Sequence, residues 1–169
     1  MKHENQPIRE TEQVTMIKKI SALVLMFVMS SCGDQPEFEK VYSFNNQTWN
    51  QNVKPEYIVE IKEVDLTYDF TLSLRTTTDY KYQNLWFFMK TESPDGTTAR
   101  EPFELMITNP NDGSWTGNKT GTVVETPLYF KSRKLPLPGV YKFTIEQGIT
   151  ESEVDEVLDL GFRVEKTGR

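Results

Sequence analysis

The sequence predicts an all-β protein: an antiparallel β-sandwich of Ig-like or jelly-roll-like type, preceded by an N-terminal lipoprotein signal peptide. Apolar and polar residues alternate in several separate runs, as they do in half-buried strands. Turn-forming Pro, Asn, Asp and Gly residues lie between the runs, so many short strands follow one another closely. This combination is typical of sandwiches and barrels, and its spacing predicts about eight strands.

Residues 1–31 are expected to be a signal peptide that is removed on export. Lys18 and Lys19 precede an apolar run over 20–28, and small residues follow just before Cys32. A positive segment, a short apolar core and small residues before a cut define such signals. The apolar run is shorter than the roughly 20 residues that a membrane span needs. Because the signal is complete from Met16 onward, we expect translation to start there; the alternative is a long segment ahead of the apolar core.

Cys32 is the predicted lipidation site. The ending Met29-Ser30-Ser31-Cys32 resembles a lipobox, with Met29 where leucine is usual. Diacylglycerol on the thiol and an N-acyl chain on the new amino terminus would hold the protein on a membrane, each buried CH₂ contributing about 0.8 kcal/mol. The alternative is an unmodified, buried cysteine behind an N-terminal anchor helix. Residues 32–40 are then the lipidated cysteine and a tether, and 41–169 form the β-sandwich domain.

The strands of the domain are assigned from their alternation, taken in chain order. Alternating runs predict strands over 57–62, 68–75, 103–108, 141–146 and 158–165. Residues 85–89 are apolar at every position, which predicts a central strand covered on both faces. Residues 93–96 and 109–113 are predicted to be tight turns, and 135–139 a rigid proline-containing loop. Only 151–157 is expected to be helical.

Composition excludes several classes of function for the mature domain. The single histidine is His3 and the single cysteine is Cys32, so the domain would lack both imidazole and a free thiol. Ser-His-Asp and Cys-His mechanisms and Cys/His zinc sites need those groups. The formal net charge of −6 disfavours binding to nucleic-acid phosphates. We therefore expect no enzymatic activity, no metal, no nucleic acid and no cofactor other than the lipid on Cys32.

Four other features of the sequence are candidate sites. Asp95-Gly96 and Asp112-Gly113 could begin calcium loops, but they lack the Glu that an EF-hand needs and read as hairpin turns. The acidic run over 151–159 could hold a glycosidase carboxylate pair, but such runs more often face water. Gly113, Gly117 and Gly121 are expected to be turn glycines.

Aromatic residues raise a further alternative, a surface glycan-binding protein. Trp115, beside a turn, and Trp49 are the candidate ligand-facing rings. The opposing interpretation is core packing, because aromatic residues are good strand formers. A structure that buries Trp49, Trp86 and Trp115 together would rule out a glycan-binding surface of exposed aromatic rings.

An ordered set of short segments resembles the gliding-motility lipoprotein family GldH of the Bacteroidetes. The segments are residues 70–75, 80–86, 93–96, 112–117, 138–143 and 158–164, which together extend over almost the whole mature chain. One departure is Gln147-Gly148-Ile149-Thr150, where the family tends to have a Gln-x-Met-Arg-like stretch, so no role of that arginine is carried over.

The resemblance implies a non-enzymatic lipoprotein of the cell envelope, a component of or accessory to gliding motility and the linked type IX secretion machinery. It brings no catalytic residues. The implied partners are a membrane, reached through the lipid anchor, and other envelope proteins of that machinery. The inner membrane, the outer membrane and the cell surface all remain open, as do the identity of the partners and the oligomeric state.

Overall fold

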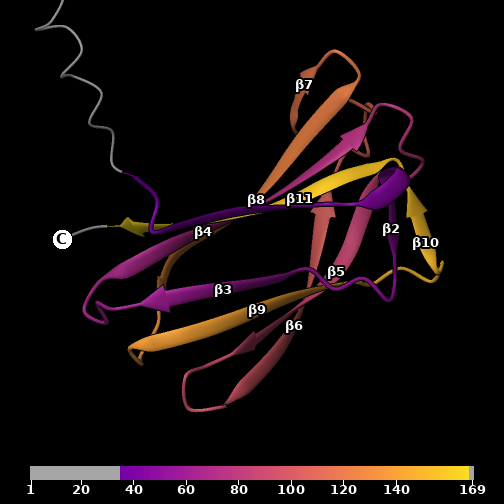
Figure 1. Ribbon diagram of the computed structural model, residues 1–169. Coiled ribbons are helices and arrows are strands. Elements are labelled where there is room, and N and C mark those ends of the chain that lie inside the picture. Colours follow the sequence, from indigo (N-terminus) through magenta and orange to yellow (C-terminus); the bar gives the residue numbers. More distant parts are fainter. Residues whose placement is uncertain (1–34, 168–169) are drawn as a thin grey trace, which may run out of the picture. The chain divides into compact units, whose positions relative to one another are not determined.

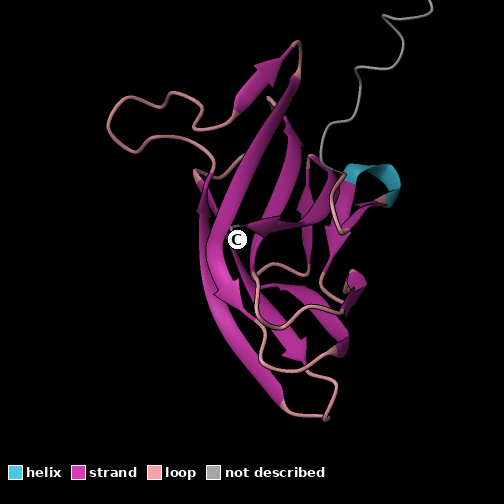
Figure 2. Cartoon of the chain, turned by 90° about the vertical axis from the view of Figure 1, so that its left-hand side faces the viewer, coloured by secondary structure: helices cyan, strands magenta, loops and turns pink. Residues whose placement is uncertain are grey.

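Eleven β-strands and one turn of 3₁₀ helix make up residues 35–167, the part of the chain that this computed structural model describes (Figure 1). The strands are β1 (Phe38–Ser43), β2 (Thr48–Asn50), β3 (Glu56–Ile61), β4 (Thr67–Thr77), β5 (Asn84–Glu92), β6 (Thr98–Met106), β7 (Asn118–Thr120), β8 (Val123–Lys134), β9 (Gly139–Gln147), β10 (Glu153–Asp155) and β11 (Val157–Thr167). The helical turn η2 (Asn45–Gln47) is drawn in cyan in Figure 2. Within this described part, no helix has the length and apolar character needed to cross a membrane.

Eight of the strands form one long antiparallel hairpin that is rolled into two sheets. From the outside inward, β1 pairs with β11, β3 with β9, β4 with β8 and β5 with β6. Alternate pairs lie in opposite sheets, of order β1-β11-β4-β8-β7 and β3-β9-β5-β6, which Figure 1 shows as two layers. This nesting is a jelly roll, so the predicted antiparallel sandwich is confirmed and is of the second of its two types. Strands β10 and β2 pair separately.

The core lies between the two sheets and is dominated by aromatic rings. Tyr57 and Phe143 of one sheet meet Phe70 and Phe162 of the other, with ring centroids between 5.1 and 5.8 Å apart. The hydroxyl of Tyr57 crosses the core and donates to the carbonyl oxygen of Leu160 at 2.6 Å. Burial raises the pKa of this phenol, which keeps it a neutral donor.

The alternation predicted along β3, β4 and β9 is confirmed by burial. In β4, Tyr68, Phe70, Leu72 and Leu74 are buried, whereas Arg75 is exposed. The turn over 93–96 joins β5 to β6, and the loop over 135–139 joins β8 to β9, both as predicted. The tether is shorter than expected, because three residues assigned to it belong to β1, which begins at Phe38.

Three predictions about individual segments are wrong. Strand β5 is interior to its sheet but covered on one face only: Phe87 is buried and Trp86 is 43% exposed. The segment expected to be helical contains β10, which pairs with β2. In β11 a bulge lies between Val157 and Asp159, so Val157 is buried where the alternation had placed Leu158.

Candidate functional site

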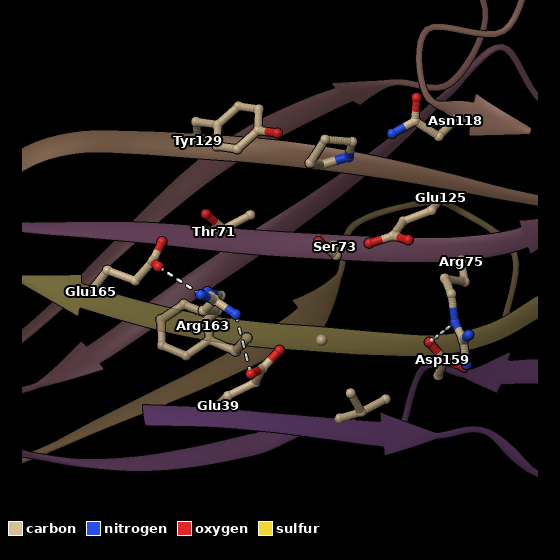
Figure 3. Close-up of a pocket in the computed structure, with 14 residues that line it drawn as sticks. Glu39, Thr71, Ser73, Arg75, Asn118, Glu125, Tyr129, Asp159, Arg163 and Glu165 are labelled. Carbon is tan, nitrogen blue, oxygen red and sulfur yellow. Dashed lines mark hydrogen bonds and ion pairs between the residues drawn. The ribbon is translucent and has the colours of Figure 1, made fainter. Parts of the chain in front are cut away.

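The outer face of the five-stranded sheet carries a groove that crosses the strands. Directly opposed residues of paired strands point to the same face, so the register lines up outward side chains in three rows. The Arg75 row contains Asn118, Glu125, Arg75 and Asp159, the Ser73 row contains Pro127, Ser73, Gly161 and Val41, and the Arg163 row contains Tyr129, Thr71, Arg163 and Glu39. The small side chains of the Ser73 row form the floor between two taller walls, and the groove encloses about 560 Å³ (Figure 3).

Each wall is held by a guanidinium bound to carboxylates. Arg75 donates from Nε to Oδ1 of Asp159 at 2.7 Å and from Nη2 to Oδ2 of the same residue. In the other wall Arg163 bridges two acids, with Nη2 at 2.7 Å from Glu165 and Nη1 at 3.3 Å from Glu39 (Figure 3). Such bidentate and bridging pairs fix the planes of the guanidinium groups. The walls are therefore preformed.

The electrostatics of the walls keep these groups charged. The hydrogen bond from Arg163 holds the pKa of the Glu165 carboxyl below its ordinary range, and Glu165 in turn raises the pKa of Arg163. Asp159 likewise raises the pKa of Arg75. A glycosidase needs one carboxyl with a raised pKa as its general acid, the opposite of what Arg163 does to Glu165. Glu165 therefore lacks the raised pKa of such a general acid.

One carboxylate of the groove, Glu125, makes no direct ion pair among the described residues, although its charge helps to raise the pKa of Arg75. Glu125 lies opposite Arg75 across β8 and β4, but Arg75 is engaged by Asp159, and Glu125 makes no ion pair with any residue in the described range. With Glu39, Asp159 and Glu165 it gives the lining four carboxylates against two guanidiniums. The groove is therefore a negatively charged site with its one free acid in the Arg75 row.

The prediction that Trp49 faces a ligand is wrong. Its side chain is completely buried: the indole stacks on Phe44 with centroids 4.9 Å apart, and Nε1 donates to the carbonyl oxygen of Val53 at 2.8 Å. Trp115, the other predicted ring, is half-buried and packs against the core beside its bridge to Thr108. An indole with its N–H satisfied inside the fold is a core residue.

Asp95 and Asp112, the candidate calcium-loop residues, stabilise tight turns in the structure. The carboxylate of Asp112 accepts from the hydroxyl and the backbone N–H of Ser114, and that of Asp95 accepts from the N–H of Thr97, which lowers the pKa of both acids. No group of acids and histidines suited to a metal occurs within residues 35–167.

Two of the three predicted turn glycines are confirmed and one is not. Gly113 and Gly121 have positive φ angles of 70° and 61°. Gly117 is required for a different reason, because a Cβ there would overlap the carbonyl oxygen of Glu125.

Most of the described domain matches one protein family. Residues 37–164, from just before β1 into β11, match the family described as GldH lipoprotein. The chain belongs to the GldH lipoprotein family. The family predicted from the resemblance is thereby confirmed.

Two curated relatives of this GldH-family chain extend over nearly its whole length. A protein of Christiangramia forsetii, named as a gliding motility lipoprotein GldH homolog, is 28% identical over 165 residues, covering 90% of this chain and 99% of the relative. The gliding motility lipoprotein GldH of Flavobacterium johnsoniae is 27% identical over 152 residues, covering 86% and 92%.

Likeness to solved structures is weak. Tripeptidyl peptidase 2 aligns with a TM-score of 0.45 at 11% identity, covering 78% of this chain and 10% of the peptidase. The VP2 subviral particle of infectious bursal disease virus aligns with a TM-score of 0.36 at 15% identity, covering 78% and 34%. This chain therefore spans only a small part of either protein, and neither likeness bears on its function.

The sequence of this GldH-family protein did not predict the groove, although it indicated which side chains of the groove face outward. Alternation marked Arg75, Asp159 and Arg163 as outward-facing, but only the cross-strand register brings them into rows. Asp159 was assigned to a solvated acidic run and is instead buried beneath Arg75. The predicted lipidation site Cys32, the signal peptide and the Met16 start lie outside the described residues.

Proposed function

We propose that this protein is a lipid-anchored, non-enzymatic component of the gliding-motility and type IX secretion machinery of the cell envelope, which works by docking to other envelope proteins. The observation that carries the proposal is the family match over residues 37–164, together with two relatives that are named gliding motility lipoproteins. The lipobox-like ending at Cys32 supplies the expected anchor.

The chemistry of the domain supports docking over catalysis. Three of the four acids of the groove are held in ion pairs with Arg75 and Arg163, and the family match brings no catalytic residues. Anchoring to a surface raises the effective concentration of the domain toward other anchored proteins, so weak contacts suffice for assembly.

The glycan-binding alternative loses its main support. It needed rings gathered on one exposed face, and Trp49 is buried in the core while Trp115 is half-buried. Trp86 is exposed but lies on β5, in the opposite sheet from the groove. We therefore do not adopt it.

The anchor is tested by metabolic labelling with a clickable palmitate, comparing the wild-type protein with Cys32→Ala in the native host. The wild type should take up label and fractionate with membranes, and Cys32→Ala should do neither. Labelled Cys32→Ala protein, or an unlabelled wild type, would contradict the anchor. Fractionation combined with protease shaving then identifies the membrane and its face.

The role is tested in a deletion strain. Loss of surface spreading or of type IX cargo secretion, restored by the wild-type gene, is the expected result. Normal spreading together with normal secretion in the deletion strain would refute the proposed role. Affinity purification after crosslinking should recover other gliding or secretion proteins with the tagged lipoprotein.

A further inference from the structure

We propose that the cross-strand groove binds an extended peptide segment of another protein, one that places a lysine or arginine beside Glu125 and an aliphatic side chain near Val41. The inference rests on the proposed docking function and names the class of partner segment. It is carried by three features of the groove: its dimensions, its unbalanced charge and its exposed apolar ends.

The dimensions follow from strand geometry. The two walls lie four residues apart along each strand, for example Thr71 and Arg75 of β4, which separates their Cα atoms by about 13 Å. The floor crosses β1, β11, β4 and β8, a distance of about 14 Å at the usual strand spacing. Gly161 in the centre of the floor has no side chain to fill this space. The groove thus has room for about four residues of one extended chain.

The charge of the groove selects a basic occupant. Both guanidiniums are already bound by carboxylates, so an anionic ligand would meet only neutralised cations and the free acid Glu125. An incoming ammonium or guanidinium group would instead form an ion pair with the Glu125 carboxylate. The chain's own segment between Cys32 and β1 is unsuited, because it carries Asp34 and Glu37 and no basic residue.

The two ends of the groove offer apolar surface to a polypeptide. Val41 on β1 is 53% exposed and Tyr129 on β8 is 57% exposed, at opposite ends of the crossing. The ring of Pro127 lies on the floor at the β8 end, two residues from Tyr129 along that strand. Exposed aliphatic and aromatic side chains at the ends of a groove with charged walls match a peptide with mixed side chains.

The test uses the full-length lipoprotein purified in detergent and a displayed library of random twelve-residue peptides. Peptides that the wild-type protein enriches are synthesised, and their affinities are measured by fluorescence anisotropy. Glu125→Lys reverses the free charge and Gly161→Leu fills the floor. Glu60→Lys, on the outer face of β3 in the opposite sheet, is the matched charge control. A Cβ at Gly161 would make only ordinary contacts, 3.7 Å or more. Because a leucine side chain extends beyond its Cβ, Ser73→Leu is made as a second floor variant, and the folding of both is checked.

The enriched peptides should contain lysine or arginine. Their binding should weaken at least tenfold in Glu125→Lys and in a folded floor variant, stay unchanged in Glu60→Lys, and weaken with added salt in the wild type. Enrichment of neutral or acidic peptides, or equal binding by all variants, would overturn the proposal. Self-association of the wild type that Glu125→Lys abolishes would also overturn it, because the occupant would then be a second copy.

The two proposals can fail separately in cells. If Glu125→Lys and Gly161→Leu restore spreading and secretion to the deletion strain while Cys32→Ala does not, the groove proposal falls and the anchored docking function stands.

Discussion

Asp69 is expected to stabilise the sandwich by completing a bulge at the edge of the five-stranded sheet. The β4–β8 register shifts between Tyr68 and Phe70, so two residues of β8, Lys131 and Ser132, stand opposite Asp69. Ser132 has a positive φ of 53°. The Asp69 carboxylate accepts from the backbone N–H of Ser132 at 2.7 Å and from Nζ of Lys131 at 2.8 Å.

The magnitude follows from these two bonds, which are shorter than the third, from the Thr167 hydroxyl at 3.3 Å. Lys131 is exposed, so solvent screens its share, and the hydrogen bond from the Ser132 N–H to an ionised acceptor is the larger contribution. Asp69→Ala should therefore lower the free energy of unfolding by about 1.5–3 kcal/mol. Asp69→Asn keeps an acceptor oxygen and should lose about half as much.

The effect should depend on pH in a defined direction. The bonds from Lys131 and from the Ser132 N–H lower the pKa of Asp69 in the folded protein, so the folded state binds its proton less tightly than the unfolded state does. The stabilisation is complete above the ordinary pKa near 4 and is lost as the pH falls through the lower folded value.

Equilibrium urea unfolding at about pH 7 and pH 3 measures both effects. The difference between wild type and Asp69→Asn should shrink at the lower pH, because the carboxyl in the unfolded state begins to bind a proton there that the folded state binds less tightly. Equal stability of the wild type and Asp69→Ala at neutral pH, or a difference that grows on acidification, would refute this account of the bulge.

Three further predictions concern the core, a close approach and a surface ion pair. Trp49→Ala should lower the free energy of unfolding by about 3–5 kcal/mol in urea unfolding, since the indole is fully buried; a change below 1 kcal/mol would contradict its core role. Gly117→Ala should lower the melting temperature through a clash costing about 1–3 kcal/mol, whereas Gly161→Ala should leave it nearly unchanged. Glu146→Gln should cost about 0.5–1 kcal/mol at neutral pH by weakening the bonds from Lys54 and Arg100. Those bonds hold the pKa of Glu146 below its ordinary range, so this difference should shrink as the pH falls through the ordinary pKa of a glutamate and vanish below the lower folded value. A pH-independent difference would argue against the ion pairs.

The sequence by itself determined the fold class and the family. Alternation decides which face of a strand is buried, and turn residues decide where a strand ends, and both are local properties. The burial of Tyr68, Phe70, Leu72 and Leu74 along β4 was predictable for that reason. The lipobox-like ending at Cys32 is likewise a local signal, and it remains a prediction.

Errors arose where neighbours distant in the sequence decide the outcome. Trp49 belongs to β2, whose partner strand β10 lies more than 100 residues further along the chain, and its indole is fully buried. β10 is a strand because β2 offers it a partner. Local propensity contains no information about such pairings, so tertiary contacts override it.

Only the tertiary structure decided that there is a groove and what charge it carries. The outward residues of β1, β11, β4 and β8 were individually recognisable as polar, but a row across strands exists only once the register is set. The bulge at Val157 sets that register in β11 and places Asp159 opposite Arg75. The pairing that follows leaves Glu125 as the free acid of the groove, which no reading along a single strand could show.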